Sequence, residues 1–283
     1  MKNKKNNRKN HAVAGVIEAL LMVALVAIVI SMIQLIYIPD IMEQKEAEHM
    51  DQVSNQFSTL KSMIEMQAIT NSSSPISTML TLGSRELPYF ITARAFGEIR
   101  TQESSDWFIS INGAPVGGQY FYDLTAIRYK ASNVYFVDQT YILEGGGIIV
   151  EQPNGDPVMR VDPSITVENG TNQIKIRFNL PIIVGVPGKN LTAGLGKCFI
   201  RTNWSEGAID IIGSLPGVNT INISTQYPNA WNESLYDMLG NNVDYKEGGS
   251  YVKISKKPTD PRPIYLYFTY YYIYTQIGHG WIK

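Results

Sequence analysis

The 283-residue sequence predicts an α+β fold, in which a long N-terminal helix is followed by a mostly antiparallel β-sandwich-like domain. Three observations favour it. Residues 12–38 form a nearly unbroken apolar run, and residues 39–70 carry apolar side chains at helical spacing. The remaining chain is rich in aromatic and β-branched residues that are bounded by Gly, Asn and Pro turns.

The apolar run at residues 12–38 is long enough to cross a membrane. A helix of this length measures about 40 Å, and the hydrocarbon core of a bilayer is about 30 Å thick. The run has no polar face and no small-residue cleavage site at its end, which argues against a soluble core helix and a cleaved secretory signal. Residues 1–11 contain five basic and no acidic residues. This basic leader predicts a cytoplasmic N-terminus and an exported remainder.

Residues 39–70 are predicted to form a helical stalk. Met50, Val53, Phe57, Leu60 and Ile64 are spaced by three or four residues and share one stripe. The following charged residues are expected on the other faces: Glu43, Lys45, Glu46, Glu48, Asp51 and Lys61. The stripe is expected to pack against the protein's own globular domain; the alternative is a coiled coil with neighbouring chains, for which two heptads are short. Pro39 removes a backbone donor and is expected to kink the helix rather than end it.

Residues 71–84 resemble a linker, and residues 85–283 are assigned to the β-sandwich domain. Asn154-Gly155 and Gly248-Gly249 predict two hairpin turns, and residues 230–239 predict a short helix. Strands are expected at 89–96, 106–111, 119–131, 133–143, 147–152, 173–184, 197–203, 208–213 and 219–224.

Six tyrosines lie between residues 265 and 274, near the end of the chain. One interpretation is a strand that packs on both faces, between the core and the long helix. The alternative is a strand for carbohydrate stacking or subunit docking, because tyrosine combines an apolar ring with a polar tip.

Composition limits the classes of partner. All 25 acidic residues follow the leader, so the rest of the chain has a net charge of about −6 and no patch suited to nucleic acid. The single cysteine, Cys198, is expected to be buried, the alternative being a bond between chains. N-glycosylation sequons that fit an exported domain occur at Asn71, Asn169, Asn190, Asn203, Asn222 and Asn232.

Catalytic and metal-binding patterns are weak. The three histidines are His11, His49 and His279, and only the last falls within the predicted domain. No phosphate-cradling glycine loop or hydrolase motif is present, and Gly145-Gly146-Gly147 is interpreted as a turn or bulge. Asn154, Asp156 and Asp162 are interpreted as turn residues rather than Ca²⁺ ligands. No catalytic residue, metal or cofactor is predicted.

Glu18 is a costly residue inside a spanning helix. Either its carboxylate reaches the cytoplasmic headgroups, or it pairs with a charge inside a bundle of helices.

The segment HAVAGVIEALLMVALVAIVI resembles the start of archaeal type IV pilin-like and archaellin-like proteins. The resemblance covers about 20 residues and implies cleavage by a prepilin-type peptidase after Ala12, with Val13 as the new N-terminus. His11 stands where the family carries a charged residue, and Ala14-Gly15 replace Ser-Pro. Glu18 falls near, but not at, the position of the family's glutamate. The partners that this implies are membrane lipid, the peptidase and other pilin-like subunits.

The expected function is that of a non-enzymatic envelope protein, either a filament subunit or a permanently anchored monomer, with a glycosylated β-domain outside the cell. The alternative is an anchored extracytoplasmic hydrolase or carbohydrate-binding module, which would use His279 or paired carboxylates.

Overall fold

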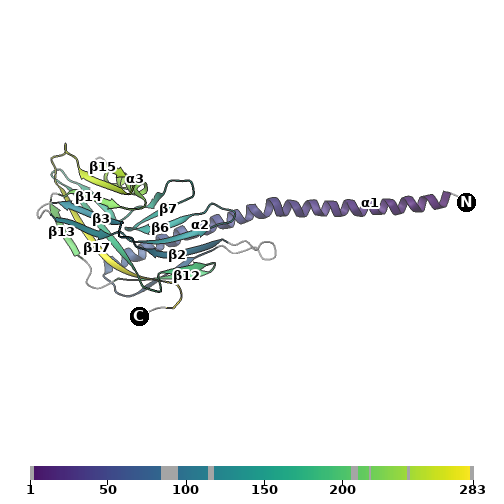
Figure 1. Cartoon of the computed structure of the whole chain (residues 1–283), viewed down its shortest axis with the longest axis horizontal. Coiled ribbons are helices and arrows are strands. Elements are labelled where there is room, and N and C mark those ends of the chain that lie inside the picture. The colour runs from purple at the N-terminus through teal and green to yellow at the C-terminus, as the bar shows by residue number, and fades with distance from the viewer. Residues whose placement is uncertain are drawn as a thin grey trace.

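The computed structural model of the chain describes residues 3–83, 95–113, 118–204, 210–216, 218–240 and 243–280. One helical rod projects from a β-rich head (Figure 1). The rod consists of α1 (Asn3–Met32), the short π-helix η1 (Ile33–Tyr37) and α2 (Ile38–Thr70). This arrangement confirms the α+β class and the expectation that the helix continues past Pro39.

The described residues of the head form three sheets, in which nearly all strand pairs are antiparallel. The first sheet has the order β1–β12–β17–β10–β9, and β13 also pairs with β17. The second sheet has the order β11–β2–β5–β6–β7–β8. The third sheet has the order β15–β16–β14–β3–β4. Among the strands that the structure describes, β10 and β17 are the parallel pair.

The strands of the first sheet are β1 (Ile76–Thr81), β9 (Ile165–Asn169), β10 (Ile174–Gly185), β12 (Lys197–Trp204), β13 (Asp210–Pro216) and β17 (Ile264–Ile277). The strands of the second are β2 (Phe96–Gln102), β5 (Ala126–Ser132), β6 (Thr140–Glu144), β7 (Gly147–Glu151), β8 (Val158–Val161) and β11 (Leu191–Gly194). The third contains β3 (Phe108–Gly113), β4 (Gly118–Asp123), β14 (Val218–Ser224), β15 (Val243–Gly248) and β16 (Tyr251–Lys256), and helix α3 spans Pro228–Leu239.

Two apolar clusters fill the head. The first core joins β10, β17, the third sheet and α3, with Phe178 and Trp231 among its fully buried side chains. The second core joins α2 to the first and second sheets. All five residues of the predicted stripe belong to the second core, so the stripe packs against the protein's own head, as expected.

Strand β17 contributes to both cores. Ile264, Leu266 and Phe268 belong to the first core, whereas Tyr271 and Ile273 belong to the second. The buried positions have even numbers in the first set and odd numbers in the second. The strand therefore buries one face in its first part and the opposite face in its second part. The tyrosine-rich tail is therefore a strand that packs on the first core with one face and, further along, on the second core, which contains α2, with the other face; this agrees in part with the first interpretation.

Several local predictions agree with the structure. Gly145 (φ 57°) and Gly146 (φ 83°) form the turn between β6 and β7, where positive φ favours glycine. Asn154 (φ 61°) lies in the turn between β7 and β8. Strands β15 and β16 pair across Gly248-Gly249, and α3 covers the predicted helix. Cys198 is buried.

Other expectations were wrong. Strand β1 occupies residues 76–81 and pairs with β12, so only residues 71–75 connect the helix to the sheet, and the predicted linker 71–84 is shorter. Residues 133–139 are not a strand; β6 begins at Thr140. Glu46 and Lys61 are buried rather than on outer faces. The predicted strand 89–96 lies largely outside the described residues.

Candidate functional site

The outstanding surface in the described part of the chain is the apolar surface of α1 and η1. Large apolar side chains from Val16 to Tyr37 are 43–76% exposed, and they lie all around the helix. Residues 14–37 extend about 36 Å, enough to cross a bilayer. Length and composition therefore make this helix a candidate membrane span. An exposed apolar surface of this size needs lipid or other protein to cover it.

The exposed surface ends at the π-helix. Leu35 is 76% exposed, whereas Ile38 is 8% exposed and Met42 is fully buried. The change in environment therefore coincides with η1 and Pro39. A π turn and a proline both disturb the regular α-helical hydrogen bonds at this boundary.

The sequence candidates on α1 have different surroundings. Glu18 lies on the exposed surface, and no side chain within the described part of the chain forms an ion pair or hydrogen bond with it. Ala12 and Val13 lie within α1, but their side chains fall outside the described set.

The second helix is held in the head by a buried carboxylate. Glu46 is fully buried and accepts backbone N–H groups from Val134 (3.1 Å), Tyr135 (2.7 Å) and Phe136 (2.7 Å). Three backbone donors therefore converge on this one carboxylate and satisfy its oxygen atoms. These bonds explain why residues 133–139 leave the strand that the sequence predicted.

Further polar contacts tie α2 to the first sheet. The Gln67 amide donates to the carbonyl oxygens of Ser74 (3.0 Å) and Thr202 (3.1 Å). Nε2 of His49 lies 3.0 Å from the carbonyl oxygen of Thr81, and burial lowers the pKa of this histidine. His49 is therefore a structural contact between α2 and β1.

The six sequons differ in accessibility. Asn71, Asn169 and Asn190 are exposed, and Asn71 ends α2 with a φ of 49°. The other three are half-buried: Asn203 in β12, Asn222 in β14 and Asn232 in α3. Because glycosylation requires an accessible side-chain amide, the three exposed asparagines are better placed for it than the three half-buried ones.

The side chains considered for catalysis or metal binding are scattered. The His279 ring packs near the Phe199 ring (6.3 Å between centroids) and lines none of the cavities described below. Asp162 accepts the Ser234 hydroxyl at 2.6 Å and so holds α3. Within the described ranges, no group of three His, Cys, Asp or Glu side chains could hold a metal ion.

Glu144 is a buried carboxyl group in the head whose pKa is raised. It is fully buried; its Oε1 accepts the Thr225 hydroxyl (2.6 Å) and the Trp231 indole N–H (2.8 Å), while Oε2 has no partner. Burial raises its pKa to about 7, although the two hydrogen bonds oppose this shift. Through the Trp231 N–H, this enclosed carboxyl group joins α3 to the end of β6.

Two open cavities border α2 on its N-terminal side. The larger, of about 500 Å³, lies against β6–β8 and is lined by Tyr141, Asp51, Asp156 and Arg160 among others. Its three charged side chains are all exposed. The second, of about 350 Å³, lies beside His49. A third cavity lies at the other end of α2.

Comparison with family models, with curated proteins and with solved structures found no match to this chain. Its function must therefore be inferred from its own residues.

Proposed function

We propose that this chain is a non-enzymatic cell-surface protein that is anchored by, or assembled through, its N-terminal apolar helix. One observation carries the proposal: a single helical rod exposes apolar side chains all around residues 14–37 and packs one stripe of its second half, α2, against the head. Such a rod links the position of the head to that of α1, because the head cannot move independently of α2.

The proposed orientation places the N-terminus in the cytoplasm and the head outside the cell. The support is the charge distribution, with five basic and no acidic residues in residues 1–11. We further propose that the head is sandwich-like, since its three sheets enclose two apolar cores, and that it is glycosylated at some of its sequons.

The pilin-like assignment is the finer part of the proposal. It rests on the resemblance of residues 11–30 and implies peptidase cleavage between Ala12 and Val13, followed by packing of α1 against other subunits. A permanently anchored monomer would keep the leader. Mass spectrometry of native protein separates the two, because processing removes the first twelve residues.

The anchoring role is tested with paired arginine substitutions. Leu21→Arg with Leu25→Arg places two charges in the exposed apolar surface of α1, and each charge costs about 3 kcal/mol at the centre of a span. We expect the variant to leave the membrane fraction, as measured by carbonate extraction and blotting. Met66→Arg with Ile69→Arg is the matched control, since these side chains of α2 are also exposed. Equal membrane retention of both variants would refute the anchoring role.

Protease treatment of intact cells tests the orientation. We expect the head to be cut from outside, whereas a protected head would overturn the proposed topology. If the protein assembles, Glu18→Ala is expected to reduce filament yield, with Glu18→Gln showing whether the charge is required.

A further inference from the structure

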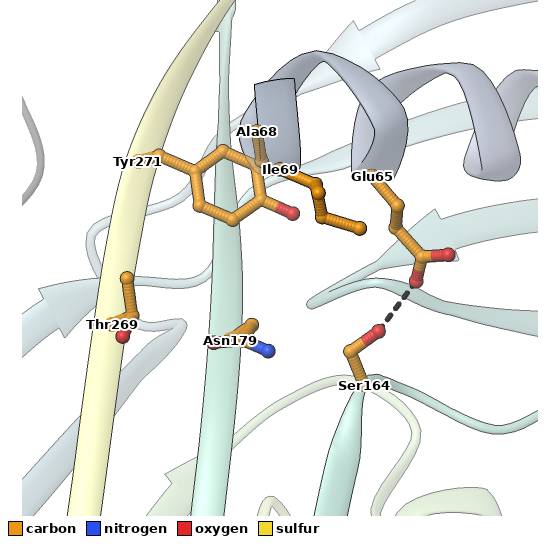
Figure 2. Close-up of a pocket in the computed structure, with 7 residues that line it drawn as sticks. All are labelled: Glu65, Ala68, Ile69, Ser164, Asn179, Thr269 and Tyr271. Carbon is orange, nitrogen blue, oxygen red and sulfur yellow. Dashed lines mark hydrogen bonds between the residues drawn. The ribbon is translucent and has the colours of Figure 1, made fainter. Parts of the chain in front are cut away.

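A cavity of about 230 Å³ lies where α2 ends against the first sheet (Figure 2). Glu65, Ala68 and Ile69 line it from the helix, and β10 and β17 form its floor. Since α2 has 33 residues, its last turn lies about 50 Å from η1. The cavity is therefore at the far end of the head from α1 and is accessible whether or not α1 is embedded.

The cavity contains a polar group that the fold leaves without a partner. Tyr271 is 3% exposed, and its hydroxyl has no hydrogen-bond partner within the described part of the chain. Figure 2 shows this hydroxyl projecting toward Ile69 and Glu65. Burial and the nearby Glu65 carboxylate raise the pKa of Tyr271, so the hydroxyl stays protonated. A ligand that accepts or donates one hydrogen bond would satisfy it.

The charge of Glu65 is already compensated. Its Oε1 forms an ion pair with Lys61 and accepts the Ser164 hydroxyl at 2.5 Å. In Figure 2 its second carboxylate oxygen points away from Ser164, and no hydrogen bond is drawn to it. The cavity thus offers one more acceptor but little net charge, which disfavours both cationic and anionic ligands.

The rest of the lining combines polar and apolar groups. Asn179 and Thr269 contribute an amide and a hydroxyl from neighbouring strands, and Ala68 and Ile69 contribute an apolar wall. No basic side chain lines the cavity within the described ranges. Hydroxyl, amide and carboxylate groups beside an apolar wall are complementary to a ring that carries hydroxyl groups at its edge and C–H groups on its face.

From the unpartnered Tyr271 hydroxyl and this mixed, nearly neutral lining, we propose that the cavity binds one neutral sugar ring of a glycan. The Tyr271 hydroxyl, the free oxygen of Glu65 and the Asn179 amide bond to the sugar hydroxyls, while Ile69 contacts its C–H face. The proposal concerns the head and does not depend on how α1 is used.

The test uses the full, unglycosylated chain in a detergent without a sugar headgroup. Saturation-transfer NMR with glucose, galactose, mannose and N-acetylglucosamine is expected to detect at least one of them, and calorimetry gives its Kd. Tyr271→Phe keeps the buried ring and is expected to weaken binding about three- to tenfold, the effect of one hydrogen bond. Asn179→Ala, at an exposed position, is expected to act similarly.

Tyr274→Phe is the matched control, because Tyr274 is exposed on the opposite face of the same strand and loses the same hydroxyl. Its Kd is expected to equal that of the unmodified chain. Absence of transfer to all four sugars, or equal Kd values for Tyr271→Phe and Tyr274→Phe, would overturn the proposal. Displacement of the sugar by acetate or tetramethylammonium would also overturn it, since a neutral site has no preference for either ion.

Discussion

The two halves of the N-terminal rod are both helical and both rich in apolar residues, yet their surroundings are opposite. The side chains of α1 from residue 14 onward are exposed all around the helix, whereas α2 buries one stripe and exposes most of its other charged side chains. The difference teaches that the apolar content of a helix does not by itself determine whether the helix packs on the rest of the protein. A helix with a polar face is anchored by a sheet, and a helix without one needs an apolar environment on every side.

The largest expected effect compares one buried and one exposed apolar residue of the rod. Phe57 is fully buried beside the Tyr129 and Tyr141 rings. Phe57→Ala is expected to lower the free energy of unfolding of the head by about 3–5 kcal/mol, measured by denaturant titration. Leu25→Ala, 59% exposed on α1, is expected to leave it unchanged. Similar losses for both would mean that α1 also packs on the head.

A smaller effect separates two glutamates of α2. Glu46→Ala removes the acceptor of three backbone N–H groups and is expected to cost about 3 kcal/mol of unfolding free energy. Hydrogen exchange at Val134, Tyr135 and Phe136 should accelerate with it. Glu48→Ala, at an exposed position two residues later, is the control and should change neither. Unaltered exchange in the Glu46 variant would contradict the proposed contact.

The smallest expected effect concerns Glu144, which forms hydrogen bonds within the head in which α2 takes no part. The pKa of Glu144 is raised from 4.5 to about 7 in the folded protein, so between these pH values the folded state binds more protons than the unfolded state. The stability from this group is fully present below pH 4.5, falls as the pH rises to 7 and is lost above it.

Glu144→Gln removes this titration while keeping an acceptor for Thr225 and Trp231. At pH 8 the free energy of unfolding of the variant is expected to be roughly 2–3 kcal/mol higher than that of the unmodified chain. At pH 4 the two should be nearly equal. A constant difference across this range, measured by chemical denaturation, would show that Glu144 does not titrate there.

Features that depend on residues close together in the sequence were predictable. The apolar run, the stripe from Met50 to Ile64 and the turns at Gly145-Gly146 and Asn154-Gly155 depend on neighbours a few residues away, and the structure agrees with each. Glu46 shows where this approach failed. It is spaced four residues from both Met42 and Met50, so it lies on the buried stripe, but its charge suggested an outer face.

The cavity at the end of α2 could not be predicted in the same way. Glu65, Asn179 and Tyr271 come from α2, β10 and β17, and Ser164 comes from the connection before β9, so the lining is drawn from separate parts of the chain. Only the cluster of tyrosines indicated that β17 had an unusual role, and it could not distinguish Tyr271, which lines the cavity, from Tyr274, which is exposed on the other face.

The sequence by itself determined the nature of the rod: a helix with apolar residues on every side is unstable in water whatever the rest of the chain does. The tertiary structure decided which polar groups meet. The carboxylate of Glu46 finds its donors about 90 residues away, and Gln67 reaches Thr202 across 135 residues. The physical reason is that hydrophobic burial is non-directional and can be seen in local composition, whereas hydrogen bonds depend on distances that only the folded chain sets.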